Sequence, residues 1–293
     1  MQPVFIRRGK GLGKQSLKQM STGIESLDRI LRGGFYEGTV CLIEDDSLAK
    51  HGLQVARCFL GKGATLQQKL FVYSHSQDED IVPELRKLSS QESAGLRIAF
   101  RYAHYPQAES QDYAFNLSRT MKNVPKLVFK RVEGVSYREL WNTIIEDIQE
   151  SLESSEDNTP LRILLKGFLG PTWNMDSFEV LQFMKSLKSL VSSLNAVCLV
   201  TVAGGSLPTE TLELLEVCSD TVLSSEAFIE SGGSFGDYSG LLRVVKPYRH
   251  HSLQNTDFEA LTFGIKRDWR HIFIEPLSLP PEGAEGTKET LEY

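Results

Sequence analysis

The chain has 293 residues, of which 41% are hydrophobic and 24% charged, and 38 acids against 32 Lys and Arg give a formal charge of −6. This composition predicts a folded chain with one large domain or two small ones, and it excludes disordered, collagen-like and disulfide-scaffold proteins. The acidic balance also disfavours a domain that coats nucleic acid through general positive charge. The four cysteines contain no Cys-x-x-Cys pair, so neither a zinc clip nor a redox dithiol is predicted.

The termini differ in composition from the body of the chain. Residues 1–20 hold five Lys and Arg and no acid, which predicts a flexible basic arm. We expect one domain over residues 21–279 and an acidic tail over 280–293. No apolar run of about 18 residues and no secretory signal are found, so we expect no membrane span and a cytosolic or nuclear protein.

The first half of the chain opens with a predicted short helix within residues 21–31, for which Ser21 or Thr22 can act as N-cap with Glu25 in the first turn. Apolar runs bounded by turn residues predict buried strands, with helices between them. In chain order we expect a strand at 39–43, a helix at 52–60, a strand at 70–74, a partly helical polar span at 77–95 and a strand at 96–102. Residues 103–136 have no clear period and are predicted to be irregular.

The second half has a sharper pattern. Apolar residues at helical spacing from Tyr137 to Leu152 predict an amphipathic helix, and seven acids without Lys or Arg between Glu139 and Asp157 predict a negative outer face. That face is either solvated or a docking surface for a basic partner. The remaining predictions are strands at 161–165, 196–202, 221–223, 241–245, 258–265 and 272–275, with helices at 177–194 and 209–217. The chain is therefore predicted to be an α/β protein with a mainly parallel sheet and antiparallel strands at its C-terminal edge.

The segment from the strand at 39–43 to the helix at 52–60 has the order of a phosphate loop but lacks the motif G-x-x-x-x-G-K-[ST]. Three successive acids, Glu44 to Asp46, would repel a triphosphate, and Lys50 is the cation that could offset them. The strand at 161–165 is followed by Lys166 rather than by an acid that could hold magnesium. The degenerate phosphate-loop position is formed by Asp45, Asp46, Ser47, Lys50 and His51.

Several motifs carry a family resemblance. The segment from Ser21-Thr22-Gly23-Ile24 to Gly38 resembles the opening signature of the RecA/KaiC superfamily. Leu242 to Lys246 with Arg249 resembles the late strand where KaiC-type rings place two cations against a neighbour's nucleotide, although Pro247-Tyr248 separates them here. Nearly the whole chain resembles the PAXNEB-type family, the fourth subunits of the Elongator complex. The matching pieces include Leu42-Ile43-Glu44-Asp45-Asp46, Arg97-Ile98-Ala99-Phe100-Arg101-Tyr102, Leu169-Gly170-Pro171-Thr172-Trp173 and Asp237-Tyr238-Ser239-Gly240-Leu241.

The resemblance implies a RecA-like three-layer fold and a place in a hetero-hexameric ring with the fifth and sixth Elongator subunits. The ring would bind tRNA and support wobble-uridine modification, while the chemistry would reside in the catalytic subcomplex of subunits one to three. It implies no catalytic residue and no cofactor bound by this chain alone, with ATP, if bound, at the ring interfaces. It also implies a protein of the cytoplasm and the nucleus.

The stretch from Leu241 to Thr256 has no acid, and its Arg243, Lys246 and Arg249 are the candidate contacts to tRNA phosphates or to a neighbour's nucleotide. The alternative is an edge strand charged to prevent aggregation. Two other functions stay open beside the accessory subunit: a working RecA-like ATPase, and a ring scaffold that touches no RNA. The adjacent histidines 250 and 251 lack further ligands at suitable spacing, so no metal site is predicted.

Overall fold

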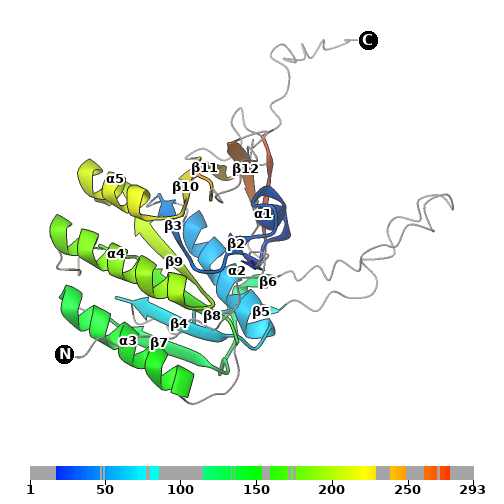
Figure 1. Cartoon of the computed structure of the whole chain (residues 1–293). Helices are drawn as coiled ribbons and strands as arrows, with labels where there is room; N and C mark the ends of the chain where they lie inside the picture. Colours follow the sequence, from blue (N-terminus) through cyan, green and yellow to red (C-terminus); the bar gives the residue numbers. More distant parts are fainter. Residues whose placement is uncertain are drawn as a thin grey trace, which may run out of the picture.

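The computed structural model describes residues 18–46, 48, 50–76, 80–85, 115–132, 134, 136–153, 159–170, 173, 176–228, 238–248, 261–268 and 271–277. Across these ranges the main sheet has the strand order β13-β12-β11-β10-β3-β9-β8-β4-β7, with helices on both faces (Figure 1). The strands from β10 to β7 run parallel, and β11, β12 and β13 add to β10 antiparallel. The predicted RecA-like α/β class is therefore confirmed.

The parallel strands are the continuous apolar runs of the sequence, because a strand covered on both faces has no polar side. The central strand, Thr39–Asp45, has its first six residues buried. The strands of the parallel part are β3 (Thr39–Asp45), β4 (Lys69–Ser74), β7 (Leu127–Arg131), β8 (Leu161–Lys166), β9 (Ala196–Ala203) and β10 (Thr221–Ala227). The antiparallel extension consists of β11 (Gly240–Lys246), β12 (Thr262–Arg267) and β13 (Ile272–Pro276).

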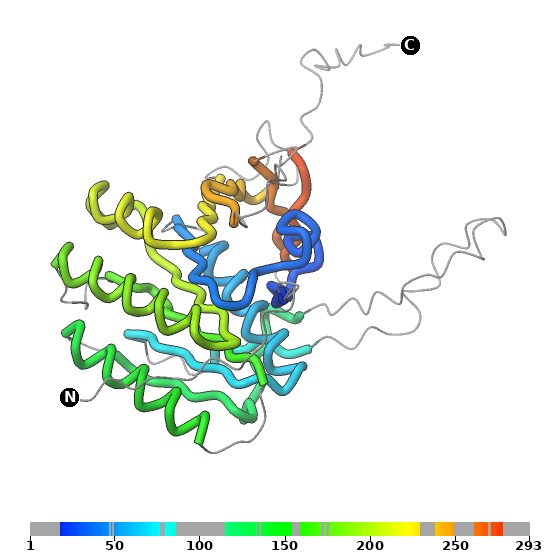
Figure 2. The backbone as a smooth tube through the Cα atoms, in the orientation of Figure 1, coloured from blue at the N-terminus to red at the C-terminus, as the bar shows by residue number. Residues whose placement is uncertain are grey.

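The helices form two outer layers. On one face α1 (Glu25–Ile30) and α2 (His51–Thr65) pack over a core that includes Leu27, Phe59 and Ile43. On the other face lie α3 (Tyr137–Glu153), α4 (Ser177–Ser193) and α5 (Thr209–Cys218), which Figure 2 shows side by side. A 3-10 turn, η3 (Gly204–Ser206), precedes α5. None of the helices among these residues combines the length and apolar composition that crossing a membrane requires.

The segment predicted to be irregular contains two strands, so that prediction was wrong. β7 is the edge strand of the main sheet and pairs parallel with β4, and β6 (Phe115–Thr120) pairs antiparallel with β5 (Pro83–Leu85). β5 also lies in the span expected to be partly helical. Both wrong predictions concern short strands. Three to six residues with few apolar positions are too few to show a hydrophobic period, so these strands left no signal in the sequence. The strand predicted at 96–102 lies outside the described residues.

The turn before α1 does not contain the predicted N-cap. Helix α1 begins at Glu25 with Ile24 as its cap residue and without a side-chain cap. Instead the carboxylate of Asp28 accepts hydrogen bonds from the Ser21 hydroxyl (2.5 Å) and from the Thr22 hydroxyl and N–H (2.7 Å each). These residues therefore fix the turn to the helix that follows it.

Two residues of the predicted arm belong to the folded body. Gln19 and Met20 form β1, which pairs with β2 (Phe35–Tyr36). Residues 1–17 lie outside the described part, so the arm itself stays a prediction.

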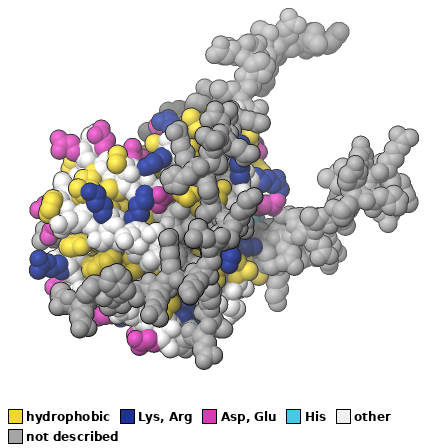
Figure 3. Space-filling view, viewed as in Figure 1, with side chains coloured by type: hydrophobic (Ala, Val, Ile, Leu, Met, Phe, Trp, Pro, Cys, Tyr) yellow, Lys and Arg dark blue, Asp and Glu magenta, His cyan; other side chains and the backbone are white. Residues whose placement is uncertain are grey.

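One acid of the predicted negative face is buried. Asp147 of α3 accepts a hydrogen bond from the Tyr73 hydroxyl (3.2 Å) and pairs with Lys130 of β7 (3.4 Å). The helix boundaries agree with the prediction, but this carboxylate connects α3 to the sheet. On the molecular face in Figure 3, acidic and basic side chains are interspersed.

Candidate functional site

The amino end of α2, where a phosphate loop would hold its ligand, is occupied by an aspartate of the same chain. Asp45 ends β3, and its carboxylate accepts hydrogen bonds from the N–H groups of Gly52 (3.0 Å) and Leu53 (3.2 Å). The Ser225 hydroxyl donates a third bond to it (2.8 Å). The first N–H groups of a helix are the groups that bind phosphate in nucleotide loops. Here an internal carboxylate takes the position of the anion.

Asp46 holds the same loop from its other side. Its carboxylate accepts a bond from the N–H of Leu48 (2.9 Å) and a short one from the N–H of Ala227, at the end of β10. Both aspartates thus accept hydrogen bonds from N–H groups of the same chain. These N–H groups are therefore not available to an external anion. Ser47 lies outside the described residues.

Lys50 and His51 form the start of α2. Lys50 adopts a left-handed conformation (φ 52°) and is exposed, while His51 is buried with Nε2 3.3 Å from the carbonyl oxygen of Ser239. Burial lowers the pKa of His51, which favours the neutral imidazole at neutral pH. A Cβ on Gly240 would lie 2.8 Å from His51 Nε2, so the ring packs directly against β11. His51 therefore joins α2 to the sheet.

The position expected for a magnesium-binding acid carries a lysine. Lys166 ends β8, and its ammonium donates to the Ser76 hydroxyl (2.9 Å). An ordinary nucleotide site has a lysine in the phosphate loop and an acid at the end of the later strand. Here the two charges are reversed, because aspartates lie in the loop and a lysine ends the later strand. Within the described ranges, no group of three or more His, Cys, Asp and Glu side chains is arranged to hold a metal ion.

Glu44, one residue before Asp45, is a buried carboxyl group. Burial, followed by the charge of Glu216 on α5, raises its pKa to about 7. The unfolded chain ionises this group near 4.5, so folding stability should fall as the pH rises from there through about 7. We expect Glu44→Gln to remove this slope and to stabilise the protein by about 1–2 kcal/mol at pH 8.

The measurement is urea unfolding of both proteins from pH 4.5 to pH 8.5. Glu216→Gln is the matched variant, because it removes the second charge and should shift the slope towards lower pH. Parallel stability profiles for the wild type and Glu44→Gln would rule out a buried carboxyl of this kind.

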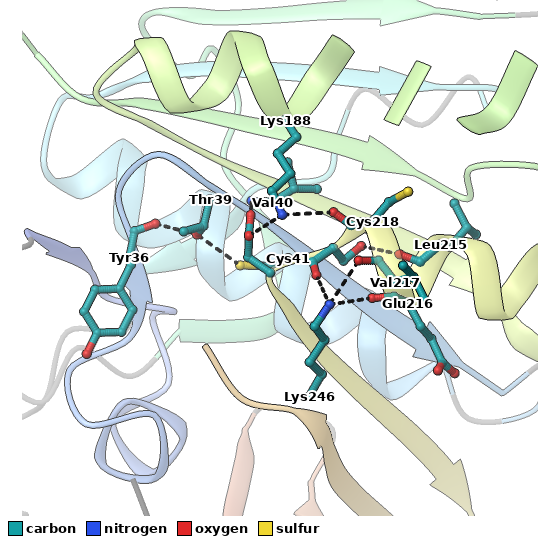
Figure 4. Close-up of polar contacts among 12 residues, drawn as sticks. Tyr36, Thr39, Val40, Cys41, Lys188, Leu215, Glu216, Val217, Cys218 and Lys246 are labelled. Atoms are coloured by element: carbon teal, nitrogen blue, oxygen red, sulfur yellow. Dashed lines mark hydrogen bonds and ion pairs between the residues drawn. The ribbon is translucent and has the colours of Figure 1, made fainter. Parts of the chain in front are cut away.

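Lys246 faces α5 because β11 contains a bulge. Leu223 pairs with Val244 while Val222 pairs with Lys246, so Val245 is an additional residue. A bulge changes the face on which the next side chain lies. The Lys246 ammonium consequently donates to the carbonyl oxygens of Glu216 (3.1 Å), Val217 (3.1 Å) and Ser219 (2.7 Å) at the end of α5 (Figure 4).

A second lysine strengthens the same end of α5. Lys188 pairs with Asp220 (2.6 Å) and donates to the carbonyl oxygen of Cys218 (3.4 Å), and Asp220 accepts a bond from the N–H of Val40 (3.0 Å). Figure 4 shows this network around the first residues of β3. It lies at the amino end of the parallel strands, opposite to the loop of Asp45 and Asp46.

Of the three residues predicted to contact tRNA phosphates or a neighbour's nucleotide, the two that the structure describes have different environments. Lys246 uses its three donors on α5, whereas Arg243 is exposed on β11, between Ser224 of β10 and Thr262 of β12. Arg249 lies outside the described residues. The sequence contained no signal for the role of Lys246, since its partners are 27 to 30 residues away.

These observations define a class: a RecA-like α/β domain whose phosphate-binding helix end is closed by an aspartate and whose magnesium-binding position carries a lysine. The model of the PAXNEB protein family matches residues 13–292, and the chain belongs to this family. The predicted family is therefore confirmed.

Proteins named Elongator complex protein 4 are similar to the chain over most of its length. The protein of Dictyostelium discoideum is 26% identical over 337 residues, covering 92% of this chain and 76% of the relative. That of Xenopus laevis is 26% identical (90% and 80% covered), and that of Homo sapiens is 24% identical (90% and 77% covered).

Proposed function

We propose that the chain is a non-catalytic subunit of an Elongator complex and supports wobble-uridine modification of tRNA. The observation that carries the proposal is the similarity to proteins named Elongator complex protein 4 over about nine-tenths of the chain. In this proposal the chain assembles with the fifth and sixth subunits in a hetero-hexameric ring that meets the catalytic subcomplex of subunits one to three.

The geometry of the phosphate-loop position favours this role over that of an ATPase. A triphosphate at the amino end of α2 would have to displace the carboxylate of Asp45 from two N–H groups. It would also meet the charge of Asp46, and no acid follows β8 to hold magnesium. Within the described residues this position is therefore not an ordinary nucleotide site, and in this proposal ATP in the assembly would rest at a ring interface with groups from a neighbour.

The assembly is tested by co-purification with the fifth and sixth subunits and by mass measurement of the complex. We expect a stable ring with two copies of each subunit. Recovery of the full-length chain as a monomer in the presence of both sister subunits would contradict the proposal.

Of the two candidate RNA contacts that the structure describes, Arg243 is the exposed one. Arg243→Glu should weaken tRNA binding by the assembled ring about tenfold at low salt and should reduce the salt slope by about one, because one phosphate contact is lost. Lys185→Glu is the matched control, since Lys185 is exposed on α4, which covers one face of the parallel strands.

Binding is measured on a tRNA transcript across a salt series. Equal affinities and slopes for the two variants and the wild type would remove Arg243 from the proposed RNA surface. Lys246→Glu is not a suitable test, because the change would also break the contacts to the end of α5.

A further inference from the structure

The outer face of α3 is uncovered in the part of the chain that the structure describes. α3 is the last of the three helices on its side of the sheet, and beyond it the sheet ends at β7 (Figure 1). Glu146, Glu150 and Glu153 are exposed on this face, and their spacing of four and three residues places them in one row. Leu152, in the same turn as the last two, is 42% exposed. The face therefore presents a row of carboxylates beside an apolar side chain.

The three glutamates of this row have no cation partner within the described ranges. Asp147 of the same helix pairs with Lys130 (3.4 Å), but no described Lys or Arg forms an ion pair with the row. Like charges at these spacings repel each other. Glu150 and Glu153 also lie at the negative end of the helix dipole, where the last turn has no basic residue. A cationic partner would relieve both effects.

The described chain starts close to the C-terminal end of α3. The carbonyl oxygen of Ser21 accepts a hydrogen bond from Arg162 (2.8 Å), whose Nε donates to Gln68 Oε1 (2.6 Å). The next residue, Lys69, donates through its ammonium to the carbonyl oxygen of Ser151, in the last turn of α3. Two hydrogen-bonded side chains and one peptide bond thus lead from Arg162 to the helix end.

The residues that precede the described part have the complementary charge. Residues 1–17 contain no acid and four basic residues, namely Arg7, Arg8, Lys10 and Lys14. The ten residues from Arg8 to Lys18 span up to about 30 Å when extended, whereas the row from Glu146 to Glu153 is only about 10 Å long. The basic residues can therefore reach the whole row. An apolar run, Val4 to Ile6, precedes them.

We propose that residues 1–17 of this chain dock on the outer face of α3, with their cations on the glutamate row and Val4 to Ile6 against Leu152. A single exposed ion pair contributes little, but several form together here, and the tether raises the effective concentration of the arm to about the millimolar range. The contact is weak, intramolecular and sensitive to salt. While it is formed, the cations of the arm are not available to phosphate groups.

The test is amide hydrogen exchange of the full chain, followed by mass spectrometry of peptides from the arm. The α3 variant combines Glu146→Lys with Glu150→Lys, and the arm variant combines Arg7→Glu with Arg8→Glu. At low salt we expect the arm to exchange about threefold more slowly in the wild type than in either variant. The difference should disappear at about 0.5 M salt. All four changes together exchange the charges across the contact and should restore part of the protection.

The matched control combines Glu210→Lys with Glu213→Lys, because both glutamates are exposed on α5 and the change in net charge is the same as in the α3 variant. The control should protect the arm like the wild type. Equal exchange of the arm in the wild type and in the α3 variant would overturn the proposal. Protection that rises with protein concentration would assign the contact to a second copy, and protection of α3 that needs the other subunits would assign it to a partner; both results would reject the arm of the same chain.

Discussion

Arg162→Ala should lower the free energy of unfolding by about 3–5 kcal/mol, the largest single effect that we expect in this protein. Arg162 is fully buried in β8, and its guanidinium donates to the carbonyl oxygens of Ser21 (2.8 Å) and Phe59 (2.9 Å) and to Gln68 Oε1 (2.6 Å). Alanine leaves these three acceptors without their donor and leaves a cavity beside Gly63, where a Cβ would lie 2.6 Å from Arg162 Cδ.

Urea unfolding measures the loss, and Arg162→Met separates its two causes. Methionine fills most of the volume but donates nothing, so its effect should lie clearly between that of alanine and the wild type. Amide exchange near Ser21 should rise in both variants, because the turn before α1 loses its connection to the sheet. A loss below about 1 kcal/mol for Arg162→Ala would contradict this role.

The parts of the fold that the sequence predicts are those with long apolar patterns. The strand of Leu161 to Leu165 and the helix that begins at Tyr137 are found where the patterns placed them. The edge strand β7 was missed, because its five residues end in Lys130 and Arg131 and give too short an apolar run. Pairing with β4, which determines that strand, depends on residues more than fifty positions away.

At the candidate site, the sequence predicted which nucleotide-binding residues are missing, but not which contacts the residues present make. The missing loop motif and the missing acid after β8 are visible in the sequence. The role of Asp45 is not, because it depends on the distance between a strand end and the helix N–H groups seven and eight residues later. Lys246 was predicted to contact tRNA phosphates or a neighbour's nucleotide, from the acid-free stretch around it and the resemblance to the late strand of KaiC-type rings, whereas the bulge at Val245 that directs it towards α5 has no sequence signature.

Asp45→Ala should lower the free energy of unfolding by about 2–3 kcal/mol, the second largest effect. The change removes a charged acceptor from the N–H groups of Gly52 and Leu53 and leaves the Ser225 hydroxyl without its bond to that carboxylate. It also removes a negative charge from the positive end of the α2 dipole. Because β3 and β10 both contact α2, the loss should appear in global unfolding and not only in the loop.

Asp45→Asn is the matched control, because its amide oxygen can still accept one N–H without the charge, and we expect about half the loss. Amide exchange at Gly52 and Leu53 reports the cap directly and should accelerate in both variants, more in alanine than in asparagine. If Asp45→Ala left exchange and stability unchanged, the carboxylate would not be the group that closes this helix end. The amino end of α2 would then be open to a phosphate, and the proposal of a non-catalytic subunit would lose one of its structural arguments, the closed helix end.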